Sequence, residues 1–360
     1  MKVYGASVSY YTGKLECYLR YKGIPYERSS PYPRAKEIKA RVGAIQHPVV
    51  ERDDGRWMSD TTPMILQLES EYPGGGILPD DPIVRFVALL IEDYADEWLW
   101  RAAMHYRWSY QHDKSLLSQI LADELTSHIR LPRFLRCYAI KRRQYRGFVV
   151  RDGVTEKTRG HVEAGYHRIL TLMTLILGER EFLLGGRPSI ADMGLMGPML
   201  RHFGQDPTPA EIMRDSAPAV FEWLGRMWHA RSDVNENTFL NAIPPDIEPL
   251  LKEICETHLV QLEENAAAFS RGKSTFTMVV QGCRYRKLPV SRYRVACLEV
   301  LRMRFASLAD VDQRTLRSLM HYEAASVLWR ADVTTNAGYD LSGEAPFNKA
   351  INVFGEGVPS

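Results

Sequence analysis

The sequence predicts an α/β domain followed by an all-α domain and a mostly helical extension. Strand and helix signals in the order βαβαββα occupy residues 1–75. The stretch "YPGGGILPDDP", rich in glycine and proline, marks a linker at 72–82. Helical periodicity runs through residues 76–241, and amphipathic helices and one hairpin signal follow in 242–360. We therefore predict three units with these bounds.

The first unit begins with a strand, helix and second strand. Predicted strands at 2–6 and 26–29 flank a helix at 13–22, which indicates a parallel strand pair. A second helix is predicted at 35–41, and the dipeptide "DG" at 54–55, between two extended segments, predicts a hairpin. These elements form a small mixed sheet with helices.

Two later helices carry start signals. The segment "SDTTPMILQLESEY" opens with Ser59, Asp60 and Thr61, all favoured capping residues. In the second unit, Ser189 is followed three residues later by Asp192, which predicts a capping box at the start of a buried helix.

The extension is predicted to fold against the helical unit. It has enough apolar residues to pack, and "TFTMVVQGCRYRKLPV" predicts a hairpin that turns near residue 281. Its predicted helices lie at 247–269, 292–308 and 318–329. We expect the tail from about Asn336 to be loose.

Composition narrows the class of protein. A chain of 360 residues, 45% of them hydrophobic, can bury two or three cores, and a net charge of +2 gives no general attraction to nucleic acid or membranes. The start "MKVYGASVSYY" is too polar for a signal peptide, and no apolar run approaches a membrane span. The cysteines are scattered without metal-ligand spacing, so we expect a cytoplasmic protein without a metal. They are Cys17, Cys137, Cys255, Cys283 and Cys297.

A polar, aromatic turn precedes the first helix. It contains Ser7, Ser9, Tyr10, Tyr11 and Thr12. The first amides of a helix have no partners within it and carry partial positive charge, so this turn suits a thiolate or another anion. The alternative is that the hydroxyl groups only cap the helix.

Four motifs together resemble the glutathione transferase superfamily over residues 1–241. "SYYTGKLECYLRYKGIPYE" is similar to the family's first helix and second strand, and "QHPVV" to the proline before its third strand. "SDTT" resembles the acidic and hydroxyl pair that opens the third helix, and "SIAD" the capping box of the second domain. The resemblance implies a thioredoxin-like, glutathione-binding domain, an all-helical C-terminal domain, and glutathione as co-substrate.

The resemblance also implies how the turn works. Ser9 falls where family members carry a catalytic Ser or Cys. Its hydroxyl would donate a hydrogen bond to the sulfur of glutathione and lower the thiol pKa, so that the thiolate attacks a second substrate. Tyr10 stands where many members have proline, so Tyr10 or Tyr11 is an alternative source of the hydroxyl. Cys17 is interpreted as a packed thiol.

Further glutathione contacts are implied residue by residue. Pro48 matches the family's cis proline, and Asp60 with Thr61 matches the pair that binds the γ-glutamyl end. Gln46 stands where a lysine is common, and His47 replaces a small apolar residue. The alternatives are that Asp60 and Thr61 only cap a helix and that His47 is a partly exposed turn residue.

A second-substrate pocket for a hydrophobic electrophile is expected between the helix that follows the linker and the turn at Ser9. Its candidate residues are Trp98, Arg101, His105, Tyr106 and Trp108. The alternative is that these aromatic side chains belong to the core.

Between Thr126 and Arg151, eight Arg and Lys residues occur without an acid. The basic stretch 128–151 either binds an anion, an acidic partner or RNA, or forms a solvated insertion between helices. We predict the insertion.

Two functions are consistent with these patterns. The first is a glutathione transferase of the serine type, expected to be a homodimer. The second is a non-catalytic binding or interaction module that keeps the fold without the chemistry, since fold alone does not decide function.

Overall fold

The computed structural model describes residues 1–233, 238–330, 334–339 and 346–347. The chain starts with a four-stranded sheet in the order β2-β1-β3-β4, in which β1 is parallel to β2 and antiparallel to β3. The strands are β1 (Lys2–Tyr4), β2 (Glu27–Ser29), β3 (Val49–Glu51) and β4 (Trp57–Ser59). The predicted parallel pair and the hairpin at 54–55 are confirmed.

Helices cover this sheet as the element order predicts. They are α1 (Tyr10–Tyr21), α2 (Ala35–Val42), preceded by the 3-10 turn η1 (Tyr32–Arg34), and α3 (Thr61–Glu71). Helix α1 begins at Tyr10, three residues before the predicted start, because Ser9 adopts an extended conformation and caps the helix. The domain is thioredoxin-like, as predicted.

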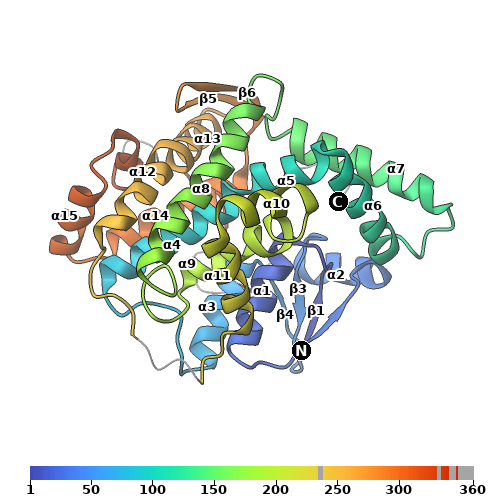
Figure 1. Cartoon of the computed structure of the whole chain (residues 1–360), viewed down its shortest axis with the longest axis horizontal. Helices are drawn as coiled ribbons and strands as arrows, with labels where there is room; N and C mark the ends of the chain where they lie inside the picture. Colours follow the sequence, from blue (N-terminus) through green and yellow to red (C-terminus); the bar gives the residue numbers. More distant parts are fainter. Residues whose placement is uncertain (234–237, 331–333, 340–345, 348–360) are drawn as a thin grey trace.

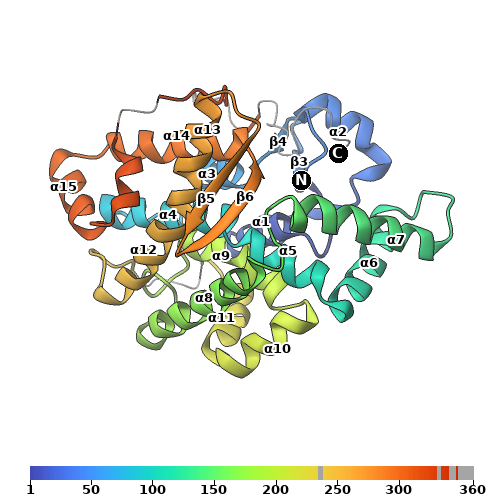
Figure 2. The same cartoon turned by 90° about the horizontal axis from the view of Figure 1, so that it is seen from above.

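The second unit is helical, as predicted (Figures 1 and 2). Its helices are α4 (Pro82–Glu97), α5 (Trp100–Ser109), α6 (Gln111–Leu125), α7 (Arg133–Gln144), α8 (Arg159–Glu179), α9 (Ile190–Pro198), α10 (Pro207–Ser216) and α11 (Pro218–His229). The π-helical turns η2 (Tyr145–Val150) and η3 (Met199–Phe203) continue α7 and α9. The predicted capping box is present, since Ser189 and Asp192 bond to each other's backbone amides.

The extension packs against the second unit and lies beside the thioredoxin-like domain (Figure 2). It contains η4 (Pro245–Ile247), α12 (Glu248–Ile254), η5 (Cys255–Leu259), α13 (Val260–Ser270), β5 (Thr275–Val280), β6 (Cys283–Pro289), α14 (Arg292–Ala306), α15 (Asp310–Leu319) and η6 (Glu323–Leu328). The predicted hairpin is confirmed, with Gln281 and Gly282 at positive φ.

One predicted helix of the extension is wrong. Only the first two residues of the segment 318–329 are α-helical, as the end of α15, and Glu323–Leu328 form the 3-10 turn η6. Asp310 and Asp312 occupy the first turn of α15, where acids stabilise a helix. The tail from about Asn336 was predicted to be loose, but Ala337, Tyr339 and Pro346 make hydrogen bonds to the rest of the structure. Residues 340–345 and 348–360 lie outside the described ranges.

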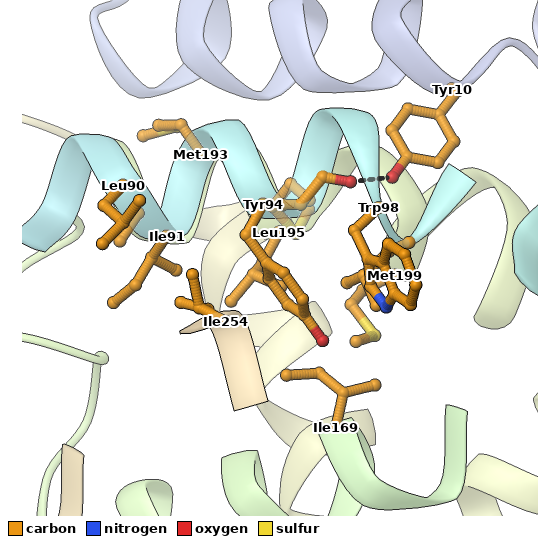
Figure 3. Close-up of a cluster of buried hydrophobic side chains, with 14 of the residues drawn as sticks. Tyr10, Leu90, Ile91, Tyr94, Trp98, Ile169, Met193, Leu195, Met199 and Ile254 are labelled. Carbon is orange, nitrogen blue, oxygen red and sulfur yellow. Dashed lines mark hydrogen bonds between the residues drawn. The ribbon is translucent and has the colours of Figure 1, made fainter. Parts of the chain in front are cut away.

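Helix α4 lies at the centre of the core (Figure 3). It packs against α9 on one side and against α14 and α15 of the extension on another. The side chains drawn around it come from α1, α8, α9 and α12 as well. Within the described ranges, none of the helices has the length and apolar composition that a bilayer crossing requires.

The basic stretch forms α7, at the outer edge of the molecule (Figure 1), and η2, which packs against α5. Arg133 pairs with Asp123 of α6, and Arg136 donates to the Ala122 carbonyl. Phe134 is 70% exposed, which is consistent with the predicted solvated insertion.

Candidate active site

The register of the sheet brings the predicted site residues to one end of it. Tyr4 pairs with Val49, and Val49 pairs with Ser59. The turn that follows Tyr4, the proline that precedes Val49 and the acid that follows Ser59 therefore meet at the same edge. Ser9, Pro48 and Asp60 thus lie on three connections at one end of the sheet.

Ser9 is the N-cap of α1. Its Oγ accepts from the amide of Thr12 at 3.4 Å, and its side chain is half-buried. Among the described residues no acceptor is present for the Ser9 hydroxyl hydrogen. The hydroxyl can therefore cap the helix as an acceptor and still donate to a bound sulfur.

Tyr10 and Tyr11 use their hydroxyl groups elsewhere. Tyr10 donates to the Ala95 carbonyl of α4 at 2.5 Å (Figure 3), and Tyr11 donates to the Asp96 carbonyl at 2.9 Å. Burial raises the pKa of both phenols well above its usual range. Of the three predicted hydroxyl sources, Ser9 is the one that these contacts leave available.

The peptide bond between His47 and Pro48 is cis, as the resemblance implies. His47 is half-buried, and its ring lies 6.0 Å from that of Tyr32. Burial and the positive charge of Arg143 lower the His47 pKa to about 4, so the imidazole is neutral near pH 7. Gln46, also half-buried, precedes this pair.

Asp60 occupies the N-cap position of α3 without capping it. Its φ is 74°, and its side chain makes no hydrogen bond to the helix amides. The Thr61 side chain is buried at the first position of α3 and makes no hydrogen bond within the described residues. The alternative that this pair only caps the helix is therefore wrong.

The Asp60 carboxylate is bonded by two tyrosines that the sequence analysis missed. Tyr293 of α14 donates to both carboxylate oxygens at 2.9 Å, and Tyr339 donates to Oδ2 at 2.7 Å. Burial raises the Asp60 pKa, and the two phenol hydrogen bonds act in the opposite direction. These contacts join residues 233 and 279 positions apart, so no local pattern could have indicated them.

The structure also contains a buried ion cluster that was not predicted from the sequence. Lys14 of α1, fully buried, contacts Glu92, Asp96 at 2.5 Å and the Thr62 hydroxyl at 3.1 Å. Burial opposes the charge of Lys14, but the two carboxylates raise its pKa, so it stays protonated. The sequence spacing indicates only the two acids of this cluster, because Glu92 and Asp96 lie four residues apart on one face of α4. It does not indicate Lys14 as their partner.

The five predicted pocket residues on α4 and α5 do not line a common open pocket. Their side chains are all buried: Trp98, Arg101, His105, Tyr106 and Trp108. Arg101 pairs with Asp152, and His105 contacts Glu163 at 2.9 Å. The alternative that these residues belong to the core is the one the structure supports.

Another aromatic cluster lies beside the Ser9 turn. Trp100 of α5 stacks on Tyr11, with ring centroids 5.6 Å apart, and Phe148 of η2 meets Trp100 edge-on at 5.5 Å. All three rings are half-buried, so each keeps some exposed apolar surface. Trp100 lies on the same helix as four of the candidate residues but was not among them.

Comparison with known proteins supports this interpretation of the first unit. Residues 3–76 match the family model described as the glutathione S-transferase N-terminal domain. This stretch is thus similar to the N-terminal domain of glutathione S-transferases, and over these residues the predicted resemblance is confirmed. No curated protein matches the sequence.

Three of the solved structures similar to the chain are the following. A glutathione S-transferase from Rhodospirillum rubrum is 18% identical, over 70% of this chain and 92% of that chain, with a TM-score of 0.42. The β-etherase LigF from Sphingobium sp. is 19% identical, over 70% and 98%, with a TM-score of 0.43. A glutathione S-transferase from Methylobacterium radiotolerans, in complex with glutathione sulfonate, is 18% identical, over 68% and 97%, with a TM-score of 0.38.

Proposed function

We propose that the chain is a glutathione transferase in which Ser9 activates the glutathione thiol. The observation that carries the proposal is the meeting of Ser9, Pro48 and Asp60 at one end of the sheet of a glutathione S-transferase N-terminal domain. The positive φ of Asp60 supports it, since a non-glycine residue rarely adopts this backbone conformation without a local reason.

In this mechanism the protein lowers the pKa of the bound thiol. The Ser9 hydroxyl donates to the sulfur, and the N-terminus of α1 adds positive potential, so the thiolate is favoured. The thiol proton passes to solvent water. The thiolate then forms a C–S bond with the electrophilic carbon, and the bond from that carbon to its leaving group breaks, so that an aryl halide would release halide. Thr61 and Asp60 bind the γ-glutamyl end, and Gln46 and His47 lie along the peptide.

We place the hydrophobic electrophile against Tyr11, Trp100 and Phe148. These rings adjoin the Ser9 turn and keep exposed apolar area, whereas the residues predicted first are buried. Aromatic faces of this kind suit a flat apolar substrate. A homodimer in the cytoplasm belongs to the same proposal, and sedimentation of the purified chain tests the dimer.

Calorimetric titration with glutathione tests the proposal, followed by a conjugation assay with an aryl halide. Binding together with product formation is the expected result. Binding without product for any electrophile in a panel would favour the alternative, a non-catalytic module. The tyrosine contacts of Asp60 favour that alternative, because they occupy the group that would hold the γ-glutamyl amine.

A further inference from the structure

The extension reaches the glutathione site at one side chain, Asp60. Tyr293 is the second residue of α14, and its hydroxyl donates to both carboxylate oxygens. Tyr339 lies in the irregular stretch 334–339, which we call the capping segment, and its hydroxyl donates to Oδ2. The two rings meet edge-on, with centroids 6.3 Å apart and planes at 87°. The carboxylate is thus enclosed by residues of the extension.

The capping segment is attached to α14. The Ala337 amide donates to both carboxylate oxygens of Glu299, at 3.0 and 3.2 Å, and its carbonyl accepts from the Arg292 side chain. The Ala337 side chain is 1% exposed and packs with Val295 and Ala296 of α14. These contacts fix where Tyr339 points.

A second contact of the chain end lies next to Asp60. The Ser59 amide on the edge strand β4 donates to the Pro346 carbonyl at 3.1 Å. The Phe347 ring lies against the Arg56 guanidinium, 4.4 Å from its carbon to the ring centroid. Residues 346–347 therefore contact β4, the strand that leads into Asp60.

The donors on Asp60 resemble those that a ligand would bring. Each phenol has one hydrogen to donate, so Tyr293 shares its hydrogen between the two carboxylate oxygens and Tyr339 donates its own to Oδ2. An ammonium group is also a donor, and its hydrogen bonds to a carboxylate are stronger than those of a neutral phenol because both partners are charged. A ligand ammonium that binds Oδ2 would therefore compete with the Tyr339 hydroxyl for this oxygen.

We propose that the capping segment closes the γ-glutamyl end of the site and that glutathione binds by displacing the Tyr339 hydroxyl from Asp60. This inference rests on the proposed function, because it takes glutathione as the ligand of Asp60. Tyr293 stays in place as a wall of the site, since it belongs to a fifteen-residue helix, whereas the capping segment has no regular structure of its own.

The test is calorimetric titration of glutathione into the full chain and into Tyr339→Phe. The substitution keeps the ring and removes the competing hydroxyl, so glutathione should bind about threefold to tenfold more tightly, the range for one net hydrogen bond. Tyr322→Phe, at a tyrosine of the extension that makes no contact with Asp60, should bind as the parent does. Equal or weaker binding by Tyr339→Phe would overturn the proposal.

Amide hydrogen exchange gives a second readout on the unaltered chain. Saturation with glutathione should speed exchange at Ala337 if the segment leaves α14, or raise it locally around Tyr339 if only the ring moves. Unchanged exchange throughout 334–339 with glutathione bound would contradict displacement. Tighter binding by Tyr339→Phe without conjugation would retain this inference and reject the transferase, whereas conjugation with unaltered affinity would do the reverse.

Discussion

At the scale of single residues, the proposed chemistry depends on Ser9. In Ser9→Ala the bound thiolate loses one hydrogen bond to a charged group, about 1.5 to 3 kcal/mol, so the thiol pKa should rise by about one to two units. Turnover near neutral pH should fall, the pH profile of the rate should move to higher pH, and glutathione affinity should change little. Steady-state kinetics over a pH series, with calorimetry for affinity, measure all three.

Ser7→Ala is the matched control, because Ser7 belongs to the same turn but its contact to Glu124 is through the backbone amide. It should keep the parent pH profile. A Ser9→Ala enzyme with unaltered rate and profile would exclude this hydroxyl from thiol activation. The tyrosine hydroxyls would then be unsuitable replacements, since both donate to α4 carbonyls.

His47 gives the fold a dependence on pH. Its pKa is about 4 in the folded protein because of burial and Arg143, against about 6.5 for a free imidazole. Between these pH values the His47 imidazole is protonated in the unfolded chain and neutral in the folded chain. The free energy of unfolding therefore falls as pH falls from about 6.5 to about 4. Buried His202, whose pKa burial also lowers, contributes in the same direction.

His47→Asn should therefore lose less stability than the parent between about pH 7.5 and about pH 5. Urea unfolding at both pH values measures the difference, and His167→Asn, at an exposed imidazole, controls for removing a ring. An equal loss of stability in His47→Asn and the parent would show that His47 does not cause the pH dependence.

At this scale the sequence predicted the residues that belong to local motifs. Ser9, Pro48, Asp60 and Thr61 each stand at a fixed place relative to a helix start or a strand, so a pattern of neighbours identifies them. Tyr293 and Tyr339 meet Asp60 only after the extension folds back over more than two hundred residues, and nothing in their own sequence context indicates this.

At the scale of elements, the packing of α4 on α9 depends on Gly194. A Cβ built at this position would lie 2.7 Å from the Glu92 Cα, which is backbone and cannot turn away. Gly194→Ala should therefore destabilise the protein by about 1 to 3 kcal/mol through overpacking, although alanine favours a helix by about 1 kcal/mol over glycine. Thermal and urea unfolding measure the net effect.

Gly225→Ala in α11 is the matched control. This glycine also lies within a helix, but an added Cβ meets no atom within 4 Å. The control should be neutral or stabilising by up to about 1 kcal/mol. If both variants gained stability alike, the close approach of α9 to α4 would not limit the packing there.

The helices and hairpins show which features of an element the sequence patterns predicted. Capping signals gave the start of α9 correctly, and turn residues gave both hairpins. The predicted pocket side chains of α5 are buried instead of exposed, because tertiary packing decides which of its many aromatic residues belong to the core. The helix at 318–329 was wrong because apolar content was given more weight than the acids that start α15.

At the scale of the whole molecule, α4 links the three predicted units through its acids. Glu92 and Asp96 pair with Lys14 of the thioredoxin-like domain. On the side of the extension, Asp93 contacts His258 at 2.6 Å, and Glu97 contacts Arg294 at 3.0 Å. The divisions at 75 and 241 remain predictions about the sequence, but the buried charges cross both of them.

Arg294→Met tests whether the extension is part of one cooperative structure. The substitution removes the mostly buried guanidinium that pairs with Glu97 and Asp152. Removing one partner of a buried ion pair lowers the free energy of unfolding by about 3 to 5 kcal/mol. Lys252→Met is the control, because its pair with Glu256 is exposed and such a pair contributes about 1 kcal/mol at most. Differential scanning calorimetry of both variants and the parent gives the comparison.

The number of transitions in the calorimetric trace shows whether the extension unfolds together with the rest of the chain. Because Glu97 lies on a helix that also binds Lys14 through its acids, loss of Arg294 should move a single transition of the whole chain to lower temperature. The double variant Arg294→Met/Glu97→Gln should recover part of the loss, since one uncompensated buried charge is removed. Two separate transitions, of which only one moves, would mean that the extension unfolds on its own, and Tyr339 could then leave Asp60 without loss of stability in the thioredoxin-like domain.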